Sequence, residues 1–158
     1  MKILHIIFTF RTGGAETMLV DMMNRQAALG HDVALLIIND GVDRNLLSTV
    51  SDRVEVFHWP RRPGTGKLRL ALRLNAWVRL RHPDAVHLHD PKLPGLLRGM
   101  DRKLVYTVHA LGLSQRYLRP TVRQCAITDA VREDALRQYP GADVRVIPNG
   151  IDTDSIRR

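Results

Sequence analysis

The sequence of 158 residues has a single cysteine, few aromatic side chains and no long apolar run. One cysteine, Cys125, excludes an internal disulfide, and its apolar neighbours favour a buried thiol in a reducing cytoplasm over a nucleophile or a metal ligand. No segment reaches the roughly 20 apolar residues that a membrane-spanning helix needs. The apolar start, residues 2–10, lacks the cleavage site of a signal peptide. We therefore expect a cytoplasmic protein, either soluble or peripheral at the inner face of the cell membrane.

The rest of the composition is that of a folded domain. Hydrophobic residues make up 44% of the chain and charged residues 25%, which argues against disorder. The net charge is +8, but the three Phe, three Tyr and two Trp are too scattered to form a platform on which bases stack. We expect one domain over residues 1–158 and no nucleic-acid partner.

Two periodicities alternate along the chain, and this alternation predicts the fold. Short apolar, β-rich runs alternate with segments whose apolar residues recur at helical spacing. Strands separated by helices form a parallel sheet through right-handed crossovers. We therefore expect an α/β fold: a doubly wound, mainly parallel, seven-stranded Rossmann-like sheet with helices on both faces. The pattern predicts strands at 2–10, 32–40, 53–59, 84–90, 103–110, 124–128 and 143–149, and helices near 15–29, 43–52, 67–82, 92–100, 114–122 and 129–139.

Gly13 and Gly14 lie where the first strand passes into the first helix. In doubly wound folds ligands bind beyond the carboxyl ends of the strands. A turn without Cβ atoms lets a ligand approach the backbone N–H groups at a helix start. Glu16 falls in the first helical turn. The sequence is equally compatible with a simple tight turn at the glycines and with helix capping by Glu16.

Three familiar motifs are incomplete in this sequence. The dinucleotide fingerprint lacks its third glycine, although Asp40 stands near the end of the second strand, so a nucleotide-binding oxidoreductase is disfavoured. A phosphate-binding loop would need glycine in place of Arg61 and a hydroxyl in place of Leu68. His87 and His89 share one face of a strand, as metal ligands do, but no third ligand is evident beside them. We predict no metal site and no cofactor.

Polar residues gather at the predicted ends of the strands. Because the strands are parallel, these residues should lie along one rim of the sheet, and a shared rim favours a functional site. Each histidine alone is well explained as a structural residue, but its place at the rim favours His109 as part of the site. The rim positions are Arg11, Thr12, His89, Asp90, His109, Thr128, Asp129, Asn149 and Gly150.

Four segments, in their order along the chain, resemble the N-terminal domain of the retaining group 1 glycosyltransferases (glycosyltransferase family 4, GT-B fold). The resemblance covers essentially the whole chain, and its most specific part is VIPNGID, which in that family leads from the first domain into the second. Two departures are Thr128, where serine is more usual, and the end of the chain at Arg158, where the C-terminal nucleotide-sugar-binding domain is absent. The segments are MKILHIIFTFRTGGAETMLVDM, YTVHAL, AITDAVREDALRQYP and VRVIPNGIDTDSI.

The resemblance implies an activity and a role for each candidate residue. Members of the family transfer a sugar from a nucleotide diphosphate sugar to an acceptor, with retention at the anomeric carbon and no required metal. Their N-terminal domain holds the acceptor, and their C-terminal domain binds the nucleotide. By this resemblance His109 lies beside the transferring sugar as the catalytic residue. The implied substrate-binding residues are Gly13, Gly14, Glu16, His89 and Thr128, with Asn149 and Gly150 in the hinge region.

Basic residues are dense in the helix expected near 67–82. Three of them, Arg69, Arg73 and Arg79, lie away from its apolar stripe, and Leu68 and Leu72 are on the same basic side. Such a helix suits an anionic membrane surface. The alternative is a solvated helix face whose long side chains cover apolar surface.

The sequence thus predicts the N-terminal half of a hexosyl or related glycosyltransferase that acts on an envelope glycan or a lipid-linked acceptor. The donor would be a nucleotide diphosphate sugar, and this chain alone is predicted to be inactive. The alternative is a non-catalytic module that binds the acceptor or docks on the membrane and works with a separate catalytic chain.

Overall fold

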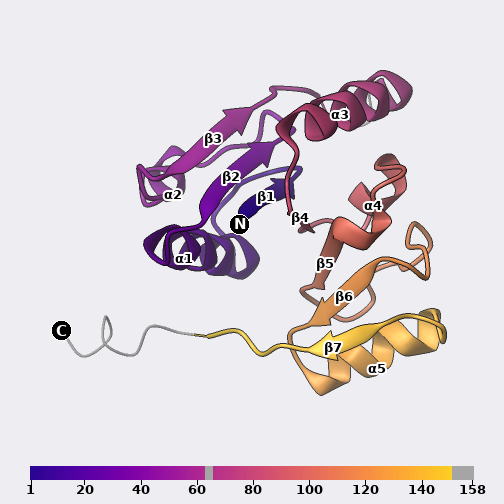
Figure 1. The fold of residues 1–158 in the computed structure, drawn as a ribbon. Coiled ribbons are helices and arrows are strands. Elements are labelled where there is room, and N and C mark those ends of the chain that lie inside the picture. Colours follow the sequence, from indigo (N-terminus) through magenta and orange to yellow (C-terminus); the bar gives the residue numbers. More distant parts are fainter. Residues whose placement is uncertain (63–65, 151–158) are drawn as a thin grey trace, which may run out of the picture.

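The computed structural model describes residues 1–62 and 66–150, and these residues form a single sheet flanked by helices (Figure 1). All strand pairs are parallel, in the order β3-β2-β1-β4-β5-β6-β7. The predicted fold class is therefore confirmed. The strands are β1 (Lys2–Ile7), β2 (Asp32–Ile37), β3 (Val54–His58), β4 (Ala85–Leu88), β5 (Leu104–Val108), β6 (Arg123–Ala126) and β7 (Val144–Val146). The helices are α1 (Gly14–Ala28), α2 (Arg44–Leu47), α3 (Lys67–Arg81), α4 (Leu93–Leu96) and α5 (Asp129–Gln138), with a 3-10 turn, η1, at Asp101–Lys103.

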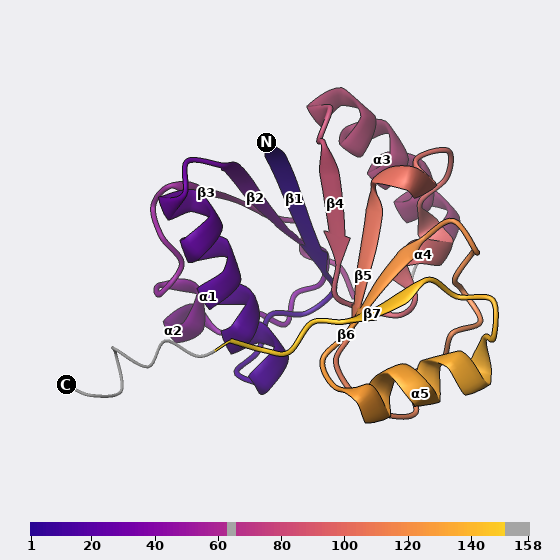
Figure 2. The ribbon, with the colours of Figure 1, turned by 60° about the horizontal axis from the view of Figure 1, so that its bottom comes forward.

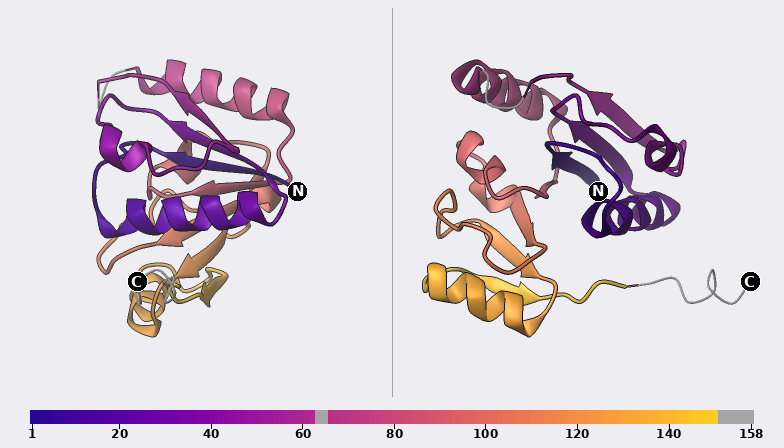
Figure 3. Two further views of the ribbon diagram at one scale, coloured as in Figure 1. Left: turned by 90° about the vertical axis from the view of Figure 1, so that its left-hand side faces the viewer. Right: turned by 180° about the vertical axis from the view of Figure 1, so that it is seen from behind.

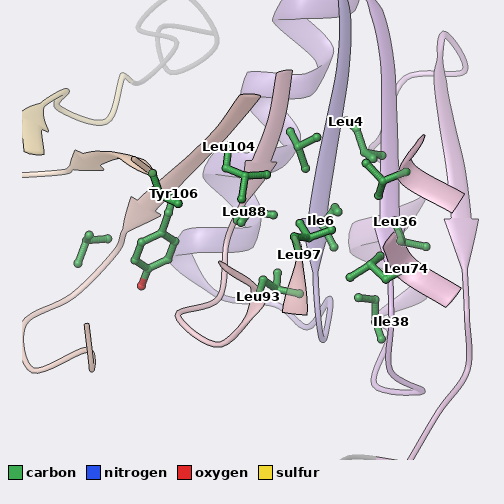
Figure 4. Packing of buried hydrophobic residues seen from close by; sticks show 14 of the residues in the cluster. Leu4, Ile6, Leu36, Ile38, Leu74, Leu88, Leu93, Leu97, Leu104 and Tyr106 are labelled. Atoms are coloured by element: carbon green, nitrogen blue, oxygen red, sulfur yellow. The ribbon is translucent and has the colours of Figure 1, made fainter. Parts of the chain in front are cut away.

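Helices cover both faces of the sheet, and each face has its own apolar cluster (Figure 2). Successive side chains of a strand point to opposite faces, so Ile6 of β1 joins the cluster under α3 while Ile7 joins the cluster under α1. The cluster under α3 is the larger, and Figure 4 shows part of it, including Leu74 of α3 and Leu93 of α4. Residues of α5 also belong to it. The smaller cluster, under α1, consists of residues from α1, β1, β2 and β3 together with Phe10.

Local sequence signals account for the ends of the main helices. α1 ends at Ala28, and Gly30 then takes a left-handed conformation (φ 82°), which glycine adopts without strain. α5 begins after Thr128, whose side-chain oxygen accepts a hydrogen bond from the Val131 N–H at 3.2 Å. α2 begins after Asp43, whose carboxylate accepts from the N–H groups of Asn45 and Leu46.

One predicted helix is wrong: the segment near 114–122 is a series of turns. Its groups bond to other parts of the fold. Arg119 donates to the carbonyl oxygens of Pro94 and Leu97 and to both carboxylate oxygens of Asp101, at 2.7 to 2.9 Å. These contacts with distant residues outweigh a weak local preference for helix.

Three other predicted elements are shorter than expected. The helix near 43–52 has only the four residues of α2, because Ser48 and Thr49 turn their hydroxyls back onto the carbonyl oxygens of Asn45 and Leu46. The first strand ends at Ile7, although Phe10 still forms one isolated bridge with Val42. The helix near 92–100 has only the four residues of α4, and the other predicted strands and helices are confirmed within a few residues at each end.

Candidate functional site

The glycine turn at the start of α1 is part of a loop that is held firmly in place. The Phe10 N–H donates to the Gly41 carbonyl at 2.8 Å, and the Asp43 N–H donates to the Phe10 carbonyl at 2.7 Å. The Thr12 hydroxyl also donates to the Asp43 carboxylate. The rim after β1 is therefore tied to the rim after β2. Asp43 was not among the predicted site residues, because nothing in the sequence pairs it with Thr12.

Neither glycine of this turn is required by the backbone conformation. Gly13 is extended, with φ at −171°, and Gly14 is not among the glycines with positive φ. A Cβ added to Gly13 would come within 2.6 Å of a Glu16 carboxylate oxygen, whereas a Cβ on Gly14 would meet no atom within 4 Å. Gly14 thus leaves open space at the N-terminus of α1, where free N–H groups and the helix dipole favour an anion.

A chain of hydrogen-bonded side chains runs from α1 to the rim. Gln26 of α1 bonds through Oε1 to His5 Nε2 at 2.8 Å, and His5 Nδ1 lies 3.2 Å from His89 Nε2. His89 Nδ1 in turn lies 3.2 Å from His109 Nε2. The structure thus brings together the two predicted residues His89 and His109. It adds His5 and Gln26, which the sequence analysis missed.

Burial keeps these imidazoles neutral at pH 7. It lowers the pKa of His5 from 6.5 to about 4, and it lowers the pKa of His89 well below 6.5. The pKa of His109, which is only partly buried, is also lowered by burial. Each ring therefore has one N–H group and one lone pair. Since an amide oxygen can only accept, His5 has its proton on Nε2, and the chain then puts a proton on Nε2 of His89 and of His109.

His87 belongs to the same group of side chains. It is paired in register with His5 across β1 and β4, and their ring centroids are 5.1 Å apart. Its Nε2 atom lies 2.6 Å from the hydroxyl oxygen of Thr107. One ligand nitrogen from each of His5, His87 and His89 lies within 4.8 Å of the other two. These are the residues of the described chain that are placed to hold a metal ion.

A groove opens beside the histidines, on the α1 side of β4, β5 and β6. The chain that follows β7 runs across toward α1 and borders this groove (Figure 2). The groove has a volume of about 700 Å³. Its lining includes Gln26, His87, Thr107 and Cys125, together with Asn149 and Gly150.

Three predicted substrate-binding residues lie outside the group of histidines. Asn149 and Gly150 are exposed and face the groove. Thr128 is exposed at the N-terminus of α5, where its hydroxyl caps the helix. Cys125 is partly buried, and burial raises the pKa of its thiol, as the interpretation of an unreactive cysteine requires.

The basic helix α3 presents both charge and apolar side chains to solvent. Leu68, Leu72 and Leu80 are 75%, 66% and 77% exposed. Arg73 stacks on the ring of Trp59 at 4.0 Å, and Arg79 donates to the carbonyl oxygen of Arg98 at 3.1 Å. Arg69 is exposed as well. Two of the three predicted membrane-binding arginines thus also cover or contact the protein itself.

The comparisons with known proteins agree with this architecture. The family model that describes glycosyltransferase family 4 matches residues 12–155, nearly the whole chain. The chain belongs to glycosyltransferase family 4. A search of curated protein sequences finds no match.

Two solved structures have the same fold at low sequence identity. HepE from Anabaena, crystallised with UDP and glucose, is 20% identical with a TM-score of 0.67, and the match covers 98% of this chain. WaaG, a glycosyltransferase involved in lipopolysaccharide biosynthesis, is 16% identical with a TM-score of 0.69 and a coverage of 96%. This chain spans only 46% of either protein. None of the helices in residues 1–62 and 66–150 is long and apolar enough to cross a membrane.

Proposed function

We propose that this chain is the acceptor-side N-terminal domain of a retaining glycosyltransferase. The enzyme would move a sugar from a nucleotide diphosphate sugar to an envelope glycan or a lipid-linked acceptor. Membership of glycosyltransferase family 4 supports the reaction class. The UDP and glucose bound to HepE support a nucleotide-sugar donor, and the role of WaaG in lipopolysaccharide biosynthesis supports an envelope acceptor.

The observation that carries this proposal is the open N-terminus of α1 at Gly14. The space above this residue admits a phosphate or a sugar to the backbone, where the helix start favours negative charge. Gly14 is not needed for the turn itself and has no neighbour that a Cβ would meet, so close approach of a ligand is a reason for a glycine at this position. Glu16, folded over Gly13, borders the same space and can accept hydrogen bonds from sugar hydroxyls.

In the proposed reaction the acceptor oxygen attacks the anomeric carbon from the face that the diphosphate leaves. The bond from this carbon to the phosphate oxygen breaks, the bond to the acceptor oxygen forms, and the leaving phosphate takes the acceptor's proton. The domain then needs no nucleophile and no metal. Neutral His109 hydrogen-bonds the sugar, since its Nδ1 lone pair is not used by His89.

The other candidate residues have supporting roles in this proposal. His89 orients His109, and Thr128 borders the acceptor side of the rim. Asn149 and Gly150 lie in the segment that would lead to the nucleotide-binding half. Because the active site of such an enzyme needs both halves, this chain alone should show no transfer and should bind nucleotides only at millimolar strength or worse.

The test uses the complete enzyme, meaning this chain together with its nucleotide-binding half. His109→Ala should reduce turnover at least tenfold with little change in melting temperature, whereas the control His31→Ala should leave both unchanged. A large loss of stability with activity retained would make His109 a structural residue. Micromolar binding of a nucleotide sugar to the isolated chain, measured by calorimetry, would show that the donor site lies in this chain and would contradict its place in the nucleotide-binding half.

A second candidate function, docking on an anionic membrane, is favoured by α3. Its three exposed leucines and its arginines form an amphipathic surface that would be unusual for a helix facing only water. A membrane contact would also bring the rim close to a lipid-linked acceptor. This function is compatible with catalysis, and it is the main one if the catalytic half is a separate chain.

A further inference from the structure

His5 in β1, His87 in the adjacent strand β4 and His89 directly after β4 point to the same face of the sheet. One ligand nitrogen of each lies within 4.8 Å of the other two. In a tetrahedral site with metal–nitrogen bonds of about 2.0 Å, ligand nitrogens are about 3.3 Å apart. His5 Nδ1 and His89 Nε2 are already 3.2 Å apart. The third nitrogen needs only a small side-chain movement, so we propose that these three residues bind a late first-row transition-metal ion such as Zn²⁺.

The outer contacts of the rings are those of metal ligands. A ligating histidine usually donates its second N–H to an oxygen acceptor, which fixes the ring and its tautomer. His5 Nε2 does so to Gln26 Oε1 at 2.8 Å, and His87 Nε2 lies 2.6 Å from Thr107 Oγ1. Because Gln26 fixes the His5 proton on Nε2, the lone pair of His5 is on Nδ1, the atom that faces His89.

The chemistry of the ligands selects the ion. Three imidazoles suit Zn²⁺, Co²⁺, Ni²⁺ and Cu²⁺, whereas Mg²⁺ and Ca²⁺ prefer oxygen. The ion has a path to the site, because Gln26, His87 and Thr107 line the groove of about 700 Å³. The ion is separate from the proposed transfer reaction, which uses no metal.

Binding would reverse the hydrogen bond between His89 and His109. Without metal, His89 Nε2 donates to His5, and His109 Nε2 donates to His89 Nδ1. A metal on His5 Nδ1 and His89 Nε2 moves the His89 proton to Nδ1, which then donates to His109 Nε2. The proton of His109 moves to Nδ1, and every ring keeps one proton. If His109 acts as proposed above, the ion changes the group that it presents to the sugar from an acceptor to a donor.

The experiment uses the 158-residue protein and Co²⁺ as a spectroscopic probe. One equivalent of Co²⁺ should give the intense visible absorption of a tetrahedral site, and Zn²⁺ should displace it. Calorimetry should give a stoichiometry of one and a micromolar or tighter Kd for Zn²⁺, with no heat from Mg²⁺. A Kd for Zn²⁺ above about 1 mM, or a Co²⁺ spectrum of octahedral type, overturns the proposal.

Variants separate this site from adventitious binding. His87→Gln should weaken Zn²⁺ at least 100-fold, and Gln26→Leu should weaken it 10- to 100-fold through loss of the outer contact. His31→Gln, a histidine outside the group, should leave the affinity unchanged. Equal affinity in wild type and His87→Gln overturns the proposal. If His87→Gln does not fold, the proposal is tested by the loss of Zn²⁺ affinity in Gln26→Leu and by the Co²⁺ spectrum of the wild-type protein.

The proposed metal site and the proposed transferase function can be disproved independently of each other. Transfer by the complete enzyme should survive EDTA, and one equivalent of Zn²⁺ should slow it in wild type but not in Gln26→Leu. If the protein binds no metal, the proposal of a metal site is wrong and the transferase proposal is unaffected. If transfer is lost in EDTA, the metal-free reaction is wrong and the proposal of a metal site is unaffected.

Discussion

The two faces of the sheet, one covered by α1 and the other by α3 (Figure 3), receive different side chains from the same strands. On the side of α3, α4 and α5, β1 and β4 present Ile6 and Leu88 to a continuous apolar cluster. On the side of α1, the same two strands present His5, His87 and His89. Because side chains alternate along a strand, β1 and β4 contribute apolar side chains to one face and the histidines to the other, where they lie beside the smaller apolar cluster under α1.

The largest effect that this comparison predicts is on stability, from the apolar face. Leu74 of α3 is fully buried, so Leu74→Ala should lower the free energy of unfolding by about 3 kcal/mol through lost burial and a cavity. Leu72→Ala, on the exposed side of the same helix, should change it by less than about 0.5 kcal/mol. Urea denaturation measures both. Equal losses in the two variants would mean that α3 contributes little to the core.

A second prediction concerns acid and the histidine face. The unfolded chain protonates His5 near pH 6.5, while the folded protein resists protonation until about pH 4. Stability is therefore present above pH 6.5 and is lost as the pH falls toward 4, by about 3 kcal/mol for this one residue. Urea denaturation at pH 7, 5.5 and 4.5 should show the loss. A flat profile over this range would mean that the histidines are hydrated.

A third prediction separates function from stability at the rim. A Cβ on Gly14 meets no atom, so Gly14→Ala should keep or slightly raise the melting temperature. In the complete enzyme the added methyl should reduce kcat/KM at least tenfold, by occupying space that the donor needs. Gly141→Ala, whose Cβ also meets nothing, is the control at the far edge of the sheet. Full activity in Gly14→Ala would show that no ligand approaches this residue.

The smallest predicted effect is at the solvent side of α3. Replacing Arg69, Arg73 and Arg79 by glutamine should weaken sedimentation with anionic vesicles several-fold at low salt, since each cation near the surface contributes about 1 kcal/mol at most. The control replaces three other exposed arginines, Arg53, Arg102 and Arg123, by glutamine. This control has the same net charge as the first variant and should weaken vesicle binding less. An equal loss of vesicle binding in both variants would show that the net charge of the protein attracts it to the membrane and that α3 is not a specific docking surface.

The sequence by itself determined the fold class and the strand ends at which polar residues collect. Hydrophobic periodicity is a local property, and it is strong in segments such as Asp32–Ile37 and Lys67–Arg81. Capping is local too, as Thr128 at the start of α5 illustrates. For the same reason the sequence could suggest His109, which directly follows a strand of the sheet.

Only the tertiary structure decided which polar side chains meet. His5 lies in an apolar strand, and its partner His89 is 84 positions away in the sequence, so no local pattern predicts their contact. The pairing follows from the strand order, which places β1 beside β4 and aligns His5 with His87. The turns of residues 112–122 depend likewise on Arg119 reaching Asp101. Such bonds form between segments that are brought together by burial of the sheet, and their geometry is a property of the packed fold.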